Sequence, residues 1–173
     1  MKCGEPELDW AAVQKRKVDL VATLRKGVAG MLKKTGVETI QAEARLTGRQ
    51  TVEAAGETYS GTNILLATGS RPAIPPIPGI DSPSVLDSTT VLELEAIPES
   101  LVVIGGGIIG LEFACFFAEL GTEVAVVEML PRLAPALDGD MAKRLMSVLK
   151  QQGITFHLSS KVTDVQESKV TFN

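Results

Sequence analysis

The sequence predicts an α/β protein built on a parallel sheet, and three observations lead to this expectation. A strand-like apolar run at residues 101–104 meets a glycine turn at residues 105–110, which opens directly into residues of helical composition. A second apolar run follows at residues 123–128, and a further helix and strand follow over residues 138–158. Alternating strands and helices with short connections are typical of a Rossmann-like, three-layer parallel sheet.

The first third of the chain predicts different elements. Apolar residues recur mostly every three or four positions over residues 8–35, which predicts one long amphipathic helix. Three short strand signals separated by glycines then predict a small antiparallel meander, at residues 37–46, 50–54 and 57–60. The apolar run at residues 63–68 predicts a further strand that is buried on both faces.

A change in composition divides the chain. Residues 71–79 hold four prolines and a glycine, which predicts an extended and stiff connector because proline fixes its own φ and donates no hydrogen bond. We therefore expect a first domain segment at residues 1–73, a proline-rich linker at 74–80 and a second domain at 81–173.

Capping residues and a hairpin complete the second domain. Asp87 is suited to cap a short helix and Asp138 a longer one that ends near residue 152. Right-handed crossovers would place the strand at residues 154–158 beside the first two. Residues 162–172 predict a hairpin, and its unpaired edge leads us to hypothesise that chains associate.

Composition excludes several classes of function. The formal net charge of -4 and the lack of a long Lys or Arg run argue against nucleic-acid binding. No apolar stretch approaches the roughly 20 residues that span a bilayer, and the acidic N-terminus has no signal-peptide pattern, so we expect a cytoplasmic protein with no membrane partner. The two cysteines, Cys3 and Cys115, are far apart and predict neither a metal site nor a redox pair.

The glycine turn has the pattern of a dinucleotide site. Gly105 would permit the tight turn, Gly107 would let the backbone approach a pyrophosphate, and Gly110 would let the helix pack closely on its strand. The helix N-terminus stabilises an anion there by about 0.3 to 1 kcal/mol before hydrogen bonds are counted. Such a turn alone is weak support, because glycines between strand and helix also serve packing.

Glu128 strengthens the prediction and selects the cofactor. It ends the second strand 18 residues after Gly110, close to the spacing at which a carboxylate accepts hydrogen bonds from a ribose. The alternative is a solvated charge at a strand end. A carboxylate there repels a 2'-phosphate, and Pro131 is expected to turn Arg132, the nearby cation, away, which favours NAD over NADP.

The residues from Val103 to Ala114, together with Ala67 to Pro72 and the proline-rich link, resemble the flavin-dependent pyridine nucleotide-disulfide oxidoreductases, dihydrolipoamide dehydrogenases above all. The resemblance covers essentially the whole chain. It implies an FAD domain interrupted by an NAD domain and followed by a dimerisation domain. We expect residues 1–73 to be the end of the first FAD segment and residues 81–173 a truncated NAD domain, in a fragment of a homodimeric parent that could serve a 2-oxoacid dehydrogenase complex.

The resemblance also implies roles for single residues toward NAD. Glu112 matches a carboxylate near the nicotinamide, although it could simply complement the helix dipole. Ile109 matches a side chain near the flavin. Glu128 matches the ribose ligand, and Val162 matches a position that packs on the adenine. The family holds the pyrophosphate at the positions of Gly105, Gly106, Gly107, Ile108, Ile109 and Gly110. Toward FAD, the resemblance implies contacts at Ala44, where several relatives have Gly, and at Thr68, Gly69 and Ser70.

Several family features are missing from the sequence. These are the first GxGxxG, the pair of cysteines with four residues between them, the later Gly-Asp flavin contact and the C-terminal His-Glu pair. We therefore expect no catalytic residue, no retained FAD and no activity, since without a thiolate pair electrons have no route between flavin and a disulfide substrate. Cys3 is expected to be a flexible terminal thiol, Cys115 a buried small hydrophobe and His157 an exposed strand residue.

Three hypotheses for function follow. The first is an NAD(H)-binding portion of a dihydrolipoamide dehydrogenase, whose parent passes electrons from dihydrolipoamide through a disulfide and FAD to NAD. The second is a portion of another family member, such as an NADH oxidase, a mercuric reductase or a soluble transhydrogenase. The third is a short protein that binds NAD(H) without catalysis.

Overall fold

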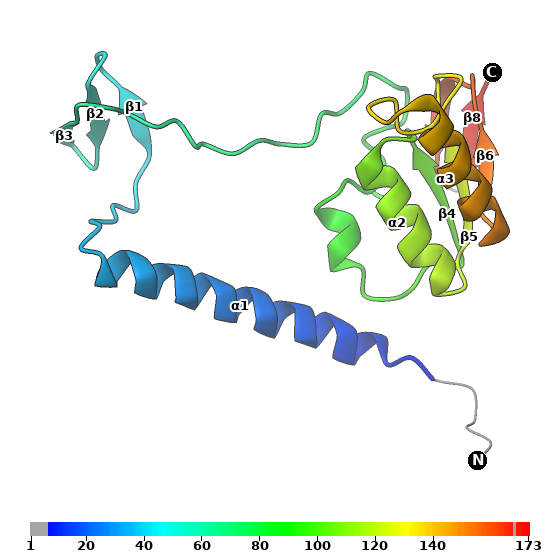
Figure 1. The fold of residues 1–173 in the computed structure, drawn as a ribbon, viewed down its shortest axis with the longest axis horizontal. Coiled ribbons are helices and arrows are strands. Elements are labelled where there is room, and N and C mark those ends of the chain that lie inside the picture. The colour runs from blue at the N-terminus through cyan, green and yellow to red at the C-terminus, as the bar shows by residue number, and fades with distance from the viewer. Residues whose placement is uncertain (1–6, 168) are drawn as a thin grey trace. The chain divides into compact units, whose positions relative to one another are not determined.

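The computed structural model describes residues 7–167 and 169–173, which form two compact units (Figure 1). One unit is Ala11–Arg71, and the other combines Pro72–Asn173 with the chain up to Trp10. The proline-rich residues 72–80 therefore belong to the second unit.

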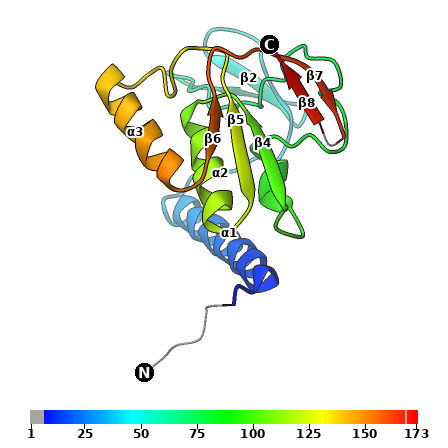
Figure 2. The same cartoon turned by 90° about the vertical axis from the view of Figure 1, so that its right-hand side faces the viewer.

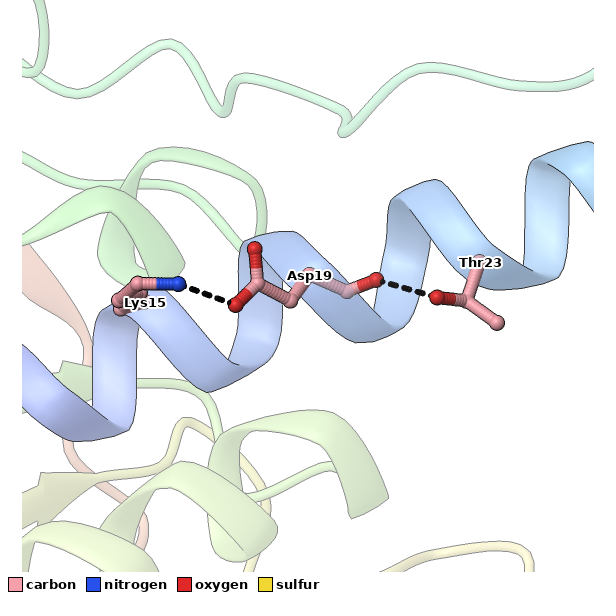
Figure 3. Close-up of polar contacts among 3 residues, drawn as sticks. All are labelled: Lys15, Asp19 and Thr23. Atoms are coloured by element: carbon pink, nitrogen blue, oxygen red, sulfur yellow. Dashed lines mark hydrogen bonds and ion pairs between the residues drawn. The ribbon is translucent and has the colours of Figure 1, made fainter.

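The first unit contains α1 (Trp10–Lys34), which confirms the predicted long helix. No residue of α1 is buried. On its surface the Lys15 ammonium pairs with the Asp19 carboxylate, and the Thr23 hydroxyl donates to the Asp19 carbonyl over 2.9 Å (Figure 3). An exposed pair four residues apart stabilises a helix by only about 0.3 to 0.5 kcal/mol, so local backbone bonding holds most of α1 together. No helix in the described part of the chain is long and apolar enough to cross a membrane.

The predicted meander is confirmed by an antiparallel sheet of β1 (Ala44–Leu46), β2 (Thr51–Ala54) and β3 (Glu57–Ser60). Ala44 pairs with Ala54, and Thr51 pairs with Ser60. The first strand is shorter than predicted, because only its last three residues find a partner in β2.

The predicted strand at residues 63–68 is wrong. The segment has no regular structure, and Leu65 and Leu66 are 90% and 64% exposed. A strand buried on both faces needs neighbouring strands and covering layers. The described part of the chain provides no strand that pairs with this segment.

The second unit holds the predicted parallel sheet. Its elements in chain order are β4 (Ser100–Ile104), α2 (Ile108–Glu119), β5 (Glu123–Val127), α3 (Gly139–Gln151) and β6 (Thr155–His157). The strands are parallel and lie in the order β4-β5-β6, which confirms the α/β class and the position expected for the third strand. Figures 1 and 2 show α2 and α3 on the same side of this sheet.

Apolar side chains between the helices and the sheet form the main core. Each such side chain stabilises the fold by about 1.5 to 3 kcal/mol when it is fully buried. The residues of this cluster that are at most 4% exposed include Leu111, Ala114, Phe117, Val124, Val126, Leu149 and Ile154. The core thus fixes the first turn of α2 against the ends of β4 and β5.

The predicted cap at Asp138 is confirmed, whereas the N-cap of the short element after Asp87 is Thr89 rather than Asp87. The Asp138 carboxylate accepts the Asp140 N–H over 3.0 Å at the start of α3. The Asp87 carboxylate accepts the N–H groups of Thr89 and Thr90 at 2.8 and 2.9 Å, although the element that follows is a single 3-10 turn, η1 (Thr90–Glu93).

The proline-rich connector packs against the C-terminal hairpin of β7 (Val162–Gln166) and β8 (Lys169–Phe172). The Val165 N–H donates to the Pro78 carbonyl over 2.9 Å. Val127, Val162 and Val165 form a second small core with partly buried side chains from the connector and its surroundings, namely Ile77, Ile80, Val85 and Val170. The connector is therefore a docked part of this unit.

Candidate nucleotide-binding site

The glycine turn closes tightly at the carboxyl end of β4. Gly105 has a φ of +103°, which L side chains rarely adopt, and its N–H donates to the Val127 carbonyl over 2.8 Å. A Cβ atom on Gly110 would lie 2.6 Å from the Gly105 carbonyl oxygen. The turn therefore requires glycine at both positions to bring α2 against the strand.

The space around Gly107, at the N-terminus of α2, is unobstructed. Its φ of -74° and ψ of 170° are ordinary extended values, and a Cβ atom built on it would meet nothing within 4 Å. No side chain caps the helix, and its first turn holds no acidic residue. The N–H groups of Ile108, Ile109 and Gly110 have no partner within the helix because they belong to its first turn. An uncapped N-terminus of a 12-residue helix, approachable through a glycine, fits a pyrophosphate.

Glu128 directly follows β5 and faces the glycine turn. The residue is only 8% exposed, its Oε2 accepts the Gly106 N–H over 2.6 Å, and its Oε1 accepts the Leu130 N–H over 2.6 Å. The alternative of a solvated strand-end charge is wrong. The structure places Glu128 beside the glycine turn, as the nucleotide hypothesis requires.

Gly106 is enclosed by the loop that follows Glu128. Its carbonyl accepts the Ala134 N–H over 2.8 Å, and a Cβ atom on Gly106 would lie 2.5 Å from Leu133 Cδ2. Sequence reasoning missed this loop, although the apolar Leu133 between two prolines was a signal of a buried turn. The Arg132 guanidinium donates to the Pro135 carbonyl over 2.8 Å, which commits this cation to its own loop.

Comparison with known proteins decides the family. Residues 4–173 match the family model of the pyridine nucleotide-disulphide oxidoreductases. The chain belongs to this family. Membership implies FAD and NAD as the cofactors of the family's enzymes.

Relatives of this oxidoreductase family are longer than the chain. Dihydrolipoyl dehydrogenase 3 of Pseudomonas aeruginosa is 42% identical over 91% of this chain and 35% of its own length. The mitochondrial dihydrolipoyl dehydrogenase of Dictyostelium discoideum is 38% identical over 99% of this chain and 37% of its own length. Among solved structures, the HOCl-induced flavoprotein disulfide reductase RclA from Escherichia coli matches with a TM-score of 0.84 and 31% identity, over 96% of this chain and 39% of that one. The chain thus spans between a third and two fifths of these relatives.

The remaining residues predicted to contact NAD lie near the turn or in the hairpin. Glu112 is exposed in α2, just beyond its first turn, and Ile108 and Ile109 are 53% and 61% exposed beside it. Val162 is 6% exposed, and its side chain belongs to the second core cluster. A contact between Val162 and adenine stays a prediction.

The residues predicted to contact FAD lie in the first unit. Ala44 begins β1, and Thr68, Gly69 and Ser70 follow on a segment without regular structure. All four residues are exposed. Contacts between these residues and FAD stay a prediction.

The described thiol and imidazole side chains lie in different elements, Cys115 in α2 and His157 in β6. Cys115 is half-buried rather than buried as predicted. Its partial burial raises the pKa of the thiol, and the nearby Glu119 charge raises it further. His157 is half-buried rather than exposed as predicted, because its ring packs 4.8 Å from that of Phe172. Cys3 lies outside the described residues. Among the described residues, no three His, Cys, Asp or Glu side chains are grouped to hold a metal ion.

Proposed function

We propose that the chain binds NAD(H) at the glycine turn, as the nucleotide-binding portion of a dihydrolipoyl dehydrogenase. The observation that carries this proposal is the open Gly107 at the uncapped N-terminus of α2, next to the Glu128 carboxylate. In the parent enzyme, dihydrolipoamide and NAD would yield lipoamide and NADH.

Different groups of the chain would contact different parts of the cofactor. The first N–H groups of α2, at Ile108, Ile109 and Gly110, would donate to the pyrophosphate, and Gly107 would let it approach the backbone. Glu128 would accept hydrogen bonds from the adenine ribose. The nicotinamide ring, when bound, supplies the acceptor for a hydride.

The same residues favour NAD over NADP. A 2'-phosphate at the ribose would meet the Glu128 carboxylate, and the two negative charges would repel. The neighbouring Arg132 guanidinium donates one hydrogen bond to the Pro135 carbonyl, within its own loop. We expect NADH to bind more tightly than NADPH.

Electron transfer would need parts of the family fold beyond these residues. The sequence holds no two cysteines with four residues between them, since Cys3 and Cys115 are its only cysteines. We propose that the chain alone transfers no electrons from a dithiol. The rest of a homodimeric, cytoplasmic flavoenzyme, and through it a 2-oxoacid dehydrogenase complex, would be the partners.

A second candidate is a flavoprotein disulfide reductase with another substrate. The structural match to the Escherichia coli RclA protein favours it, because 96% of this chain aligns with a disulfide reductase that is induced by HOCl. NAD binding by this chain would be common to both candidates. Steady-state assays of the full-length parent with dihydrolipoamide as electron donor would separate them.

A fluorescence titration with NADH and NADPH tests the proposed binding. The Gly107→Val variant should fold normally, because the backbone at this position is extended and a Cβ atom meets nothing within 4 Å. The new side chain would, however, block the approach of the pyrophosphate. Gly107→Val should therefore weaken NADH binding at least about tenfold, which corresponds to a loss of about 1.4 kcal/mol of binding free energy. Gly139→Val is the matched control, since the Cβ atom of its new side chain would lie at an ordinary 3.8 Å from the Arg132 guanidinium. Equal NADH affinity in wild type and Gly107→Val would reject the proposed site.

A further inference from the structure

We infer that Glu128 is also a positioning residue, which holds the glycine turn in its nucleotide-binding shape before any nucleotide arrives. This inference rests on the proposed function and adds a role to the residue that would receive the ribose. It predicts that the carboxylate strengthens binding at the pyrophosphate, which Glu128 itself would not touch.

The two oxygens of the carboxylate join separate parts of the site. Oε2 accepts the N–H of Gly106 in the first turn, and Oε1 accepts the N–H of Leu130 in the next loop, each over 2.6 Å. Hydrogen bonds to an ionised acceptor are roughly twice as strong as neutral ones, and this pair is shielded because Glu128 is 8% exposed. Each oxygen has a second lone pair, so the ribose hydroxyls could still be accepted.

The loop completes the hold on Gly106. Ala134 donates its N–H to the Gly106 carbonyl over 2.8 Å, and the Leu133 side chain, which is 1% exposed, packs against the glycine Cα. Gly106 is thus held by hydrogen bonds at its N–H and its carbonyl, and the Leu133 side chain occupies the space where a side chain on Gly106 would lie. The position of the adjoining Gly107, and with it the first turn of α2, depends on these contacts.

Replacing the carboxylate with an amide should disturb the turn without removing the side chain. In Glu128→Gln, the amide oxygen can accept one of the two N–H groups, but the amide NH₂ would face the other donor. One backbone N–H is then left unsatisfied in a nearly buried place, and the turn must shift to relieve it. The pyrophosphate subsite should weaken even for a ligand that offers no ribose hydroxyls.

A pair of ligands separates this role from ribose binding. We would titrate ¹⁵N-labelled wild type and Glu128→Gln with ADP and with 2',3'-dideoxy-ADP, which keeps the two phosphates and lacks both hydroxyls. The inference predicts that the substitution weakens dideoxy-ADP binding about tenfold. Unchanged dideoxy-ADP affinity, with only ADP weakened, would overturn it. Glu123→Gln is the control, because it removes the same charge from an exposed position at the other end of β5.

Amide exchange in the nucleotide-free protein gives a test that does not need binding. The inference predicts faster hydrogen exchange, by about tenfold, at whichever of the Gly106 and Leu130 amides loses its acceptor in Glu128→Gln, with core amides of β5 unchanged. Exchange at both amides equal to wild type would overturn the inference. Failure of wild type to bind NADH, ADP or dideoxy-ADP would instead reject the proposed function, and the exchange result would still decide the role of Glu128.

Discussion

The packing of the proline-rich connector predicts a large loss of stability in Gly79→Ala. A Cβ atom at this position would lie 1.8 Å from the Val165 carbonyl oxygen and 2.9 Å from its carbonyl carbon. Both atoms belong to the backbone of β7, so no side-chain rotation can relieve the overlap. Gly79 also has a φ of +77°, where a side chain adds strain of about 1 to 2 kcal/mol.

The connector must therefore move away from β7 in this variant. That movement would break the hydrogen bond between the Val165 N–H and the Pro78 carbonyl, which contributes about 0.5 to 1.5 kcal/mol. It would also loosen Ile77 and Ile80 from the second core cluster. The strain and the lost bond together predict a destabilisation of about 1.5 to 3.5 kcal/mol.

Urea unfolding followed by far-UV circular dichroism would measure this loss. Gly139→Ala is the control, since its Cβ would make only an ordinary contact at 3.8 Å with Arg132. We expect Gly79→Ala to lower the unfolding midpoint well beyond the control. A change of less than about 0.5 kcal/mol, the usual size for an uninvolved surface site, would refute the docked connector.

Three further outcomes follow from the structure. Burial raises the pKa of the Cys115 thiol, so the contribution of this residue to stability should fall as pH rises through the raised pKa. Iodoacetamide should therefore alkylate Cys115 more slowly in the folded than in the urea-unfolded chain. Equal alkylation rates of the Cys115 peptide in the two states would contradict this. The N–H groups of Thr90 and Thr89 hold the pKa of Asp87 below its ordinary 3.8. The stability that the ionised Asp87 carboxylate contributes is therefore present above pH 3.8 and is lost as pH falls through the lowered pKa. Asp87→Ala should accordingly lower Tm at pH 7 and have little effect in strong acid, and equal Tm values at pH 7 would be inconsistent with a stabilising role of these hydrogen bonds. Chains should also associate through the free edge of the β7-β8 hairpin, and light scattering that shows a concentration-independent monomer mass would count against this.

Local sequence patterns were sufficient for much of the second unit. The strand, glycine turn and helix around Gly107 follow one another within a few residues, and the cap at Asp138 depends only on its immediate neighbours. The order of the three parallel strands follows from short right-handed crossovers. The turn and the cap are thus specified by residues close in sequence, and the strand order by the handedness of the connections.

Features that depend on distant contacts could not be predicted. Residues 63–68 are apolar enough for a buried strand, but strand formation also requires partner strands. The prolines of the connector indicate stiffness, yet nothing in them reveals that Pro78 would bond to Val165. The spacing of Glu128 predicted that it would reach the site, whereas its bonds to Gly106 and Leu130 became evident only once the loop around them was folded.

The most direct test of the central claim is a ¹⁵N chemical-shift titration of the chain with NAD⁺. Nucleotide binding at the open N-terminus of α2 predicts saturable shifts at the amides of Gly107, Ile108, Ile109 and Gly110, with smaller changes near Glu128. The shifts should be absent in Gly107→Val. Saturable shifts confined to other residues, or none at millimolar NAD⁺, would contradict the assignment of this turn as the nucleotide site.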